Sequence, residues 1–124
     1  MQFNFADTKI EGLKLITLKP IPDDRGWFLK TFHAPSFAAA GLCTAFPESF
    51  VSLSKRNVIR AMHFQTPPHD HAKLMRCQAG EILDVVLDLR TGSATCREHQ
   101  AFTLDGRNPQ CLYVPVGLAH GLLQ

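Results

Sequence analysis

The sequence predicts an all-β domain, and a jelly roll is the leading architecture. Helical periodicity is almost absent, and short β-prone runs recur at spacings of roughly 8–12 residues with turn residues between them. The runs are Leu13–Lys19, Trp27–Phe32, Phe50–Ser54, Asn57–Phe64, Ala72–Gln78, Glu81–Arg90, Glu98–Leu104 and Gln110–Val114. Because no crossover helices are available to connect parallel strands, we expect a sandwich or barrel of antiparallel strands.

Between these runs the sequence indicates turns and one short helix. In "PSFAAAGL", Pro35 can begin a helix and Gly41 can end it. The turn signals are Asp24-Arg25-Gly26, Ala79-Gly80, Thr91-Gly92-Ser93 and the segment from Asp105 to Pro109. Near the end, "VPVGLAHG" predicts a tight turn before a final apolar run.

The longest run, "EILDVVLDLR", alternates between two faces. One face carries Leu83, Val85, Leu87 and Leu89, and the other carries Ile82, Asp84, Val86, Asp88 and Arg90. The first face is expected in the core. The mixed face is expected to meet solvent, although the inside of a polar cavity is the alternative.

Length and composition indicate one ordinary globular domain over residues 1–124. Hydrophobic residues make up 45% and charged residues 19%, and the formal net charge is +2. No basic run is longer than Lys55-Arg56, so a nucleic-acid surface is not expected. The first residues do not resemble a signal peptide and no stretch has the length of a membrane span, so we expect a cytoplasmic protein without a membrane partner. The four cysteines form no C-x-x-C pair and are expected to be reduced.

The segment "RAMHFQTPPHDHAKLMR" offers both metal ligands and cations. His69 and His71 could bind a metal together with His120 or Glu81, since imidazoles suit zinc, iron, copper or nickel. Pro67-Pro68 marks this part as a loop, where exposed histidines are common, so the loop interpretation is favoured over a metal site.

Three other side chains of the sequence are candidates for chemistry on an anionic substrate. His63 lies inside an apolar strand and could act as a base near neutral pH. Lys73 could stabilise negative charge that develops on a substrate oxygen. Arg60 is close in sequence, but residues 60 and 63 of a regular strand point to opposite faces, so a shared pocket requires a bulge, a twist or the end of a strand.

Several motifs together resemble one family, the carbohydrate epimerases of the dTDP-4-dehydrorhamnose 3,5-epimerase type, within the cupin superfamily. The resemblance runs from "DDRGWF" through "SLSKRNVIRAMHFQ" and "AKLMRCQAGEILDVVLDLRTGSAT" to "LYVPVGLAHG", over roughly residues 10 to 124. It implies a cupin-type jelly roll, a homodimer, and an enzyme that needs no metal or other cofactor. The implied substrate is a nucleotide-diphosphate sugar of the 4-keto-6-deoxy class, in deoxysugar or cell-surface polysaccharide synthesis, including dTDP-rhamnose and lipopolysaccharide.

The implied chemistry is removal of a proton from a carbon next to the C4 ketone and its return to the opposite face. By position, His63 matches the general base and Lys73 the lysine near the developing enolate. For substrate binding, Arg25 and Arg60 match groups that hold the diphosphate, Phe28 matches an aromatic residue at the nucleotide base, and His120 matches a second histidine of the active site.

The chain also departs from the family pattern. Glu48, Ser49 and Phe50 replace residues that contact the nucleotide sugar, and Ala61-Met62 replaces Gly-Leu. The chain stops at Gln124, before the positions of the family's catalytic tyrosine and of the carboxylate that orients the base, so we expect the C-terminal part of the fold to be missing. A catalytically inactive sugar-nucleotide binding module, a 3,4-ketoisomerase and a metal-dependent cupin enzyme therefore remain as alternatives.

Overall fold

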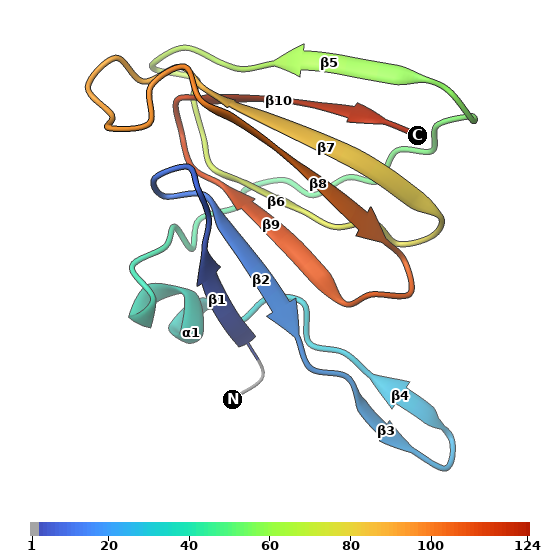
Figure 1. The fold of residues 1–124 in the computed structure, drawn as a ribbon. Coiled ribbons are helices and arrows are strands. Elements are labelled where there is room, and N and C mark those ends of the chain that lie inside the picture. Colours follow the sequence, from blue (N-terminus) through green and yellow to red (C-terminus); the bar gives the residue numbers. More distant parts are fainter. Residues whose placement is uncertain (1–2) are drawn as a thin grey trace.

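The computed structural model describes residues 3–124, which form two facing β-sheets, a separate hairpin and one short helix (Figure 1). The strands are β1 (Phe3–Asp7), β2 (Lys14–Leu18), β3 (Ile21–Asp23), β4 (Gly26–Phe28), β5 (Ile59–His63), β6 (Lys73–Met75), β7 (Glu81–Asp88), β8 (His99–Asp105), β9 (Gln110–Val114) and β10 (Leu118–Leu123). The sheet orders are β1-β2-β9-β6 and β5-β10-β7-β8, and each paired neighbour is antiparallel. The predicted all-β jelly roll is confirmed.

Two hydrophobic cores hold these layers together. The first lies between the sheets and is built from β-strand residues such as Val86, Leu104 and Leu112, all at most 1% exposed. The second lies on the outer face of the sheet β1-β2-β9-β6, where Ile16 and Phe37 are fully buried. That sheet is therefore covered on both faces, which explains why its strands are rich in buried residues.

The helix α1 (Ala34–Ala39) covers the outer core, as the sequence predicts. Pro35 lies in its first turn, the Nδ1 atom of His33 accepts a hydrogen bond from the backbone N–H of Ser36, and Gly41 follows the last turn with a φ of +77°. Phe37 projects from the helix onto the rings of Phe3 and Phe5. No helix formed by residues 3–124 has the length and apolar character needed to cross a membrane.

The expected orientation of β7 is wrong. Asp84, Val86 and Asp88 are fully buried and face the space between the sheets, whereas Leu83, Val85 and Leu87 are only partly buried. Alternation separates the two faces of a strand, but it does not say which face is inside when both are largely apolar. The mixed face is therefore the inner face of the sandwich and does not meet solvent.

Two predicted strand regions also differ from the structure. Phe50–Ser54 is not a strand, and its apolar side chains are open to solvent. A β-prone run forms a strand only where a neighbouring strand supplies hydrogen bonds, and none of the described residues does so here. The run Trp27–Phe32 is a strand only as far as Phe28, in the β3–β4 hairpin. The strands β1 and β3 were not predicted from the sequence.

The loop that follows β7 is organised by the buried carboxylate of Asp88. Arg90 donates hydrogen bonds to it from its backbone N–H and its guanidinium, and the hydroxyls of Ser93 and Thr95 donate two more, at 2.8 and 2.7 Å. Burial alone would raise the pKa of the Asp88 carboxyl, but these hydrogen bonds outweigh it and hold the pKa well below its usual range.

The Asp88 network predicts a defined loss of stability. We expect Asp88→Asn to lower the free energy of unfolding by about 3 kcal/mol, because it leaves the half-buried Arg90 without its counter-charge. Since the folded-state pKa is depressed, this contribution is present above the unfolded-state pKa of about 4 and is lost as the pH falls below it. Denaturant titrations of both proteins across this pH range measure the effect.

Asp105→Asn is the matched control, because Asp105 pairs with Arg107 at the same i, i+2 spacing but at an exposed position. We expect a much smaller change in this variant. Equal losses in the two variants would contradict the assignment of Asp88 as a buried anchor.

Candidate functional site

A bulge in the edge strand β5 places Arg60 and His63 on the same face of their sheet. His63 lies opposite His120 and Arg60 lies opposite Leu122, so three steps on β5 match two steps on β10. The extra residue is accommodated at Gly121, where a side chain would meet Ala61 at 2.5 Å. A shared pocket for residues 60 and 63 needed an irregularity in the strand, and this bulge supplies it.

Lys73 and His120 meet across the gap between the two sheets. Lys73 begins β6 on one sheet, His120 lies in β10 on the other, and the Nζ and Nε2 atoms are 3.2 Å apart. His120 is 6% exposed and Lys73 is half-buried. Burial lowers the pKa of Lys73, and the nearby carboxylate of Asp84 raises it in part.

Asp84 completes this group, although it was not among the site residues predicted from the sequence. It lies on the inner face of β7, is fully buried, and its Oδ1 atom is 3.7 Å from Nδ1 of His120. The available signal was the pair of carboxylates, Asp84 and Asp88, which lie four residues apart on one face of a largely apolar strand. Asp88 accepts hydrogen bonds from the loop that follows β7, whereas Asp84 faces His120 and Lys73.

These side chains lie along one edge of the sandwich. β5 and β6 are both terminal strands of their sheets. On β5, His63 and Arg60 are exposed. Exposure then decreases from Lys73, which is partly buried, through His120 to the fully buried Asp84. The arrangement offers an accessible imidazole, a cation that can stabilise a developing oxyanion, and a guanidinium suited to phosphate. It fits an anionic substrate with a polarised carbonyl group.

The structure does not bring Arg25 and Phe28 to this group. Both lie on the β3–β4 hairpin, which projects away from the two sheets (Figure 1). Phe28 is 59% exposed, and Arg25 pairs with Asp23 at 2.8 Å. Their role in nucleotide binding therefore stays a prediction, and it concerns the surface of the projecting hairpin.

The loop histidines lie apart from the group on the inner face. His69 and His71 are exposed, and the recorded contact between these two residues joins Nδ1 of His71 to the backbone oxygen of His69. Among residues 3–124, no group of three or more His, Cys, Asp or Glu side chains is placed to hold a metal ion. His69, His71 and His120 therefore do not form the three-histidine set that a metal site would need here.

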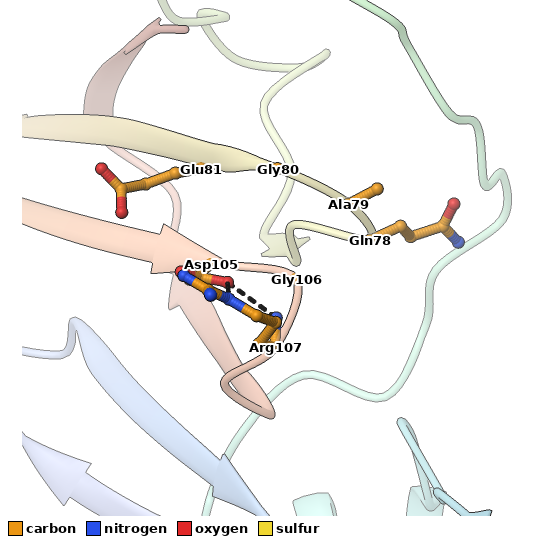
Figure 2. A pocket seen from close by; sticks show the side chains of 7 residues that line it. All are labelled: Gln78, Ala79, Gly80, Glu81, Asp105, Gly106 and Arg107. Carbon is orange, nitrogen blue, oxygen red and sulfur yellow. Dashed lines mark hydrogen bonds and ion pairs between the residues drawn. The ribbon is translucent and has the colours of Figure 1, made fainter.

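A separate hollow of about 470 Å³ lies at the turn between β8 and β9 (Figure 2). It is lined by Gln78, Ala79, Gly80, Glu81, Asp105, Gly106 and Arg107. Its one cation, Arg107, is bound by the carboxylate of Asp105, and none of the predicted site residues lines it. The hollow is a poorer candidate for an anionic substrate than the edge between β5 and β6.

Comparison with known proteins connects this geometry to a family. Residues 7–124 match the family model of dTDP-4-dehydrorhamnose 3,5-epimerase. The chain belongs to the dTDP-4-dehydrorhamnose 3,5-epimerase family. A curated epimerase of this family from Methanothermobacter thermautotrophicus is 37% identical over 122 residues, which cover 98% of this chain. The chain spans 65% of the length of that relative.

Solved structures of the epimerase family share the fold closely. The dTDP-4-dehydrorhamnose 3,5-epimerase of Elizabethkingia anophelis superposes with a TM-score of 0.95 at 31% identity, and the match covers 99% of this chain and 68% of that one. The dTDP-6-deoxy-D-glucose-3,5-epimerase of Legionella pneumophila, solved in complex with dTDP-4-keto-L-rhamnose, superposes with a TM-score of 0.91 at 34% identity over 98% of this chain and 64% of that one. The cupin-type jelly roll of the family is therefore the fold of this chain.

Proposed function

We propose that this chain carries the proton-abstracting site of an epimerase that acts on a dTDP-linked 4-keto-6-deoxy sugar. The observation that carries the proposal is the placement of His63, Lys73 and His120 on facing inner surfaces at one open edge of the sandwich. Membership of the epimerase family supports the same reaction class, and a related structure was solved with a dTDP-4-keto sugar. The product would enter deoxysugar or cell-surface polysaccharide synthesis in the cytoplasm.

In the proposed mechanism His63 is the base. Its imidazole takes the proton from the carbon next to the C4 ketone, and the electrons of the broken C–H bond move onto the carbonyl oxygen to give an enolate. His63 is exposed on β5, so a bound sugar can reach it. The mechanism uses side chains of this chain for this step and requires no cofactor.

Lys73 is the proposed partner of the enolate oxygen. Its ammonium group lies between the two sheets beside His120, and its partial burial would strengthen its interaction with a developing negative charge. His120 accepts a hydrogen bond from the ammonium and so limits the directions in which Lys73 can point. We assign His120 to substrate binding at the same site.

Arg60 is proposed to bind the diphosphate of the substrate. Its position on the same face of β5 as His63 supports this role. Its Nε atom donates a 2.7 Å hydrogen bond to Ser54, which orients the guanidinium. Arg25 and Phe28 are proposed to contact the nucleotide from the projecting hairpin.

Return of a proton to the opposite face of the sugar requires an acid. Tyr113 is the one tyrosine of the sequence, and it does not serve, because its side chain is 5% exposed on the outer side of β9. Its hydroxyl accepts a hydrogen bond from the backbone N–H of Cys43 in the second core. Tyr113 is therefore assigned to the packing of the second core and not to proton return.

Product analysis tests the reaction class. We expect incubation with dTDP-4-dehydro-6-deoxyglucose to change the configuration at C3, C5 or both, while the ketone stays at C4, as followed by NMR of the sugar ring. A carbonyl that moves to C3 would make the chain a 3,4-ketoisomerase. Binding of the nucleotide sugar with neither a change of configuration nor solvent exchange at C3 or C5 would indicate an inactive binding module.

A homodimer is part of the same proposal. The segment 50–54 is β-prone, and Phe50, Val51 and Leu53 are 80%, 73% and 93% exposed without a strand partner among the described residues. Trp27 on the projecting hairpin is 70% exposed as well. Unpaired β-prone segments and apolar patches of this kind favour association with another chain.

The dimer proposal predicts the effect of a charge in this segment. We expect Leu53→Glu to convert a dimer into a monomer, because a buried carboxylate at the subunit interface would be left without a partner. Light scattering coupled to size-exclusion chromatography measures the mass. Lys55→Glu, an exposed change two residues away, should leave the dimer intact. A wild-type protein that is monomeric at micromolar concentrations would contradict the proposal.

A further inference from the structure

The carboxylate of Asp84 has an unusual environment for a fully buried charge. Both of its oxygens lack a hydrogen bond, and its cross-strand neighbours are Phe102 on β8 and Leu122 on β10. Asp88, four residues along the same face, is satisfied by several donors. Burying a carboxylate without donors costs several kcal/mol, so stability of the fold does not explain Asp84.

The group that faces Asp84 is His120. Its Nδ1 atom is also buried without a hydrogen bond, and it lies 3.7 Å from Oδ1 of Asp84. A movement of about half an ångström would bring the two atoms to hydrogen-bonding distance. The two unsatisfied groups are therefore each other's nearest available partners.

The contact on the other side of the imidazole determines its tautomer. A lysine ammonium has donors and no acceptor, so Lys73 donates and Nε2 of His120 accepts across the 3.2 Å separation. A neutral imidazole that accepts at Nε2 carries its hydrogen on Nδ1, which points at Asp84. The three side chains then form one directed chain from β6 through β10 to β7, with a negative charge at one end and a positive charge at the other.

We propose that Asp84 is a positioning residue for Lys73, acting through His120. Asp84 holds the imidazole in the Nδ1–H tautomer, and the imidazole in turn fixes the ammonium at the edge where the substrate enters. The carboxylate also compensates the positive charge of Lys73 in a partly buried position. This inference rests on the proposed function in one respect, that Lys73 faces the developing enolate.

The charge balance around Lys73 supports this role. Burial lowers the pKa of Lys73 and the charge of Asp84 opposes that effect. On the inner face of the other sheet, His120 on β10 contacts Lys73, and His63 and Arg60 lie on β5; none of these three side chains supplies negative charge. Asp88 shares the face of Asp84, but its charge is taken up by Arg90. Removing the carboxylate of Asp84 would therefore leave the burial of Lys73 unopposed.

The experiment measures the reactivity of Lys73 in the free protein, without any sugar nucleotide. Competitive labelling with acetic anhydride across a pH series, followed by mass spectrometry of the peptide that contains Lys73, gives the apparent pKa of its amine. We expect Asp84→Asn to lower this pKa by about one unit, which is about tenfold more neutral amine at a given pH. Asp88→Asn, at an equally buried position of the same strand face, should leave the Lys73 pKa unchanged.

A second measurement on the wild-type protein keeps the inference testable if Asp84→Asn does not fold. Nitrogen NMR of the imidazoles should show His120 protonated at Nδ1 and unprotonated at Nε2. A folded Asp84→Asn protein with an unchanged Lys73 pKa, or the Nε2–H tautomer in the wild type, would overturn the inference. Neither measurement involves substrate, so a failure of the proposed epimerase activity would be seen separately.

Discussion

Replacing His63 with asparagine is expected to slow deuterium incorporation from solvent into dTDP-4-dehydro-6-deoxyglucose by about 10²–10⁴-fold, the range of a general base. Asparagine is smaller than histidine but polar, so it can still form hydrogen bonds, whereas its amide cannot accept the substrate proton. His63 is exposed on an edge strand, so the variant should fold normally. The measurement is the initial rate of exchange by proton NMR at saturating substrate.

His69→Asn is the control for this variant. His69 is an exposed histidine six residues further along, on the loop between β5 and β6, and it has no role in the proposed mechanism. We expect its exchange rate to equal that of the wild type. A similar loss in both variants, or an unchanged rate in His63→Asn, would remove His63 from the role of base.

Lys73→Met is expected to lower the exchange rate by about 10²–10³-fold, comparable to the loss of one oxyanion donor. The reason is that the enolate oxygen would develop its charge at a partly buried position without a cation. Methionine approximates the length of the lysine stem and keeps its apolar contacts, while Nε2 of His120 loses its hydrogen-bond donor. Substrate affinity, measured by calorimetry with dTDP, should change little, because Arg60 and not Lys73 is assigned to the diphosphate.

Lys9→Met provides the comparison for Lys73→Met, since Lys9 is exposed and makes only a long ion pair with Glu98 at 3.9 Å. Its exchange rate should match the wild type. If Lys73→Met weakened dTDP binding while the exchange rate at saturation stayed the same, Lys73 would belong to the nucleotide site and the proposed enolate contact would be wrong.

The strand pattern of the sequence predicted most of the architecture because most of the core strands have a local signal. β2, β5, β6, β7 and β9 lie within the predicted runs, and β8 and the helix α1 each extend one residue beyond theirs. Phe50–Ser54 has the same local signal and still forms no strand, because strand formation also depends on a partner that local sequence does not specify. The prediction of which face of β7 is buried was wrong for a related reason, since burial depends on what covers each face of the sheet.

In the candidate site, too, the local sequence identified individual residues but not the contacts between them. His63, Lys73 and His120 were identified through motifs, and their meeting across the sheets follows from strand register that the sequence does not reveal. Strand parity alone separated Arg60 from His63, and the bulge opposite Gly121 brought them to one face. Asp84 was placed on the mixed face without a role, because its importance depends on a contact with a residue 36 positions away in the sequence.

Deuterium exchange tests the central claim, that this chain enolises a 4-keto sugar nucleotide. The protein is incubated with dTDP-4-dehydro-6-deoxyglucose in heavy water, and the proton signals at C3 and C5 are followed by NMR against a protein-free sample. We predict that at least one of these signals disappears much faster with the protein, even if no epimer accumulates, and that His63→Asn abolishes the difference. Binding of the sugar nucleotide without any protein-dependent loss of either signal would contradict the account.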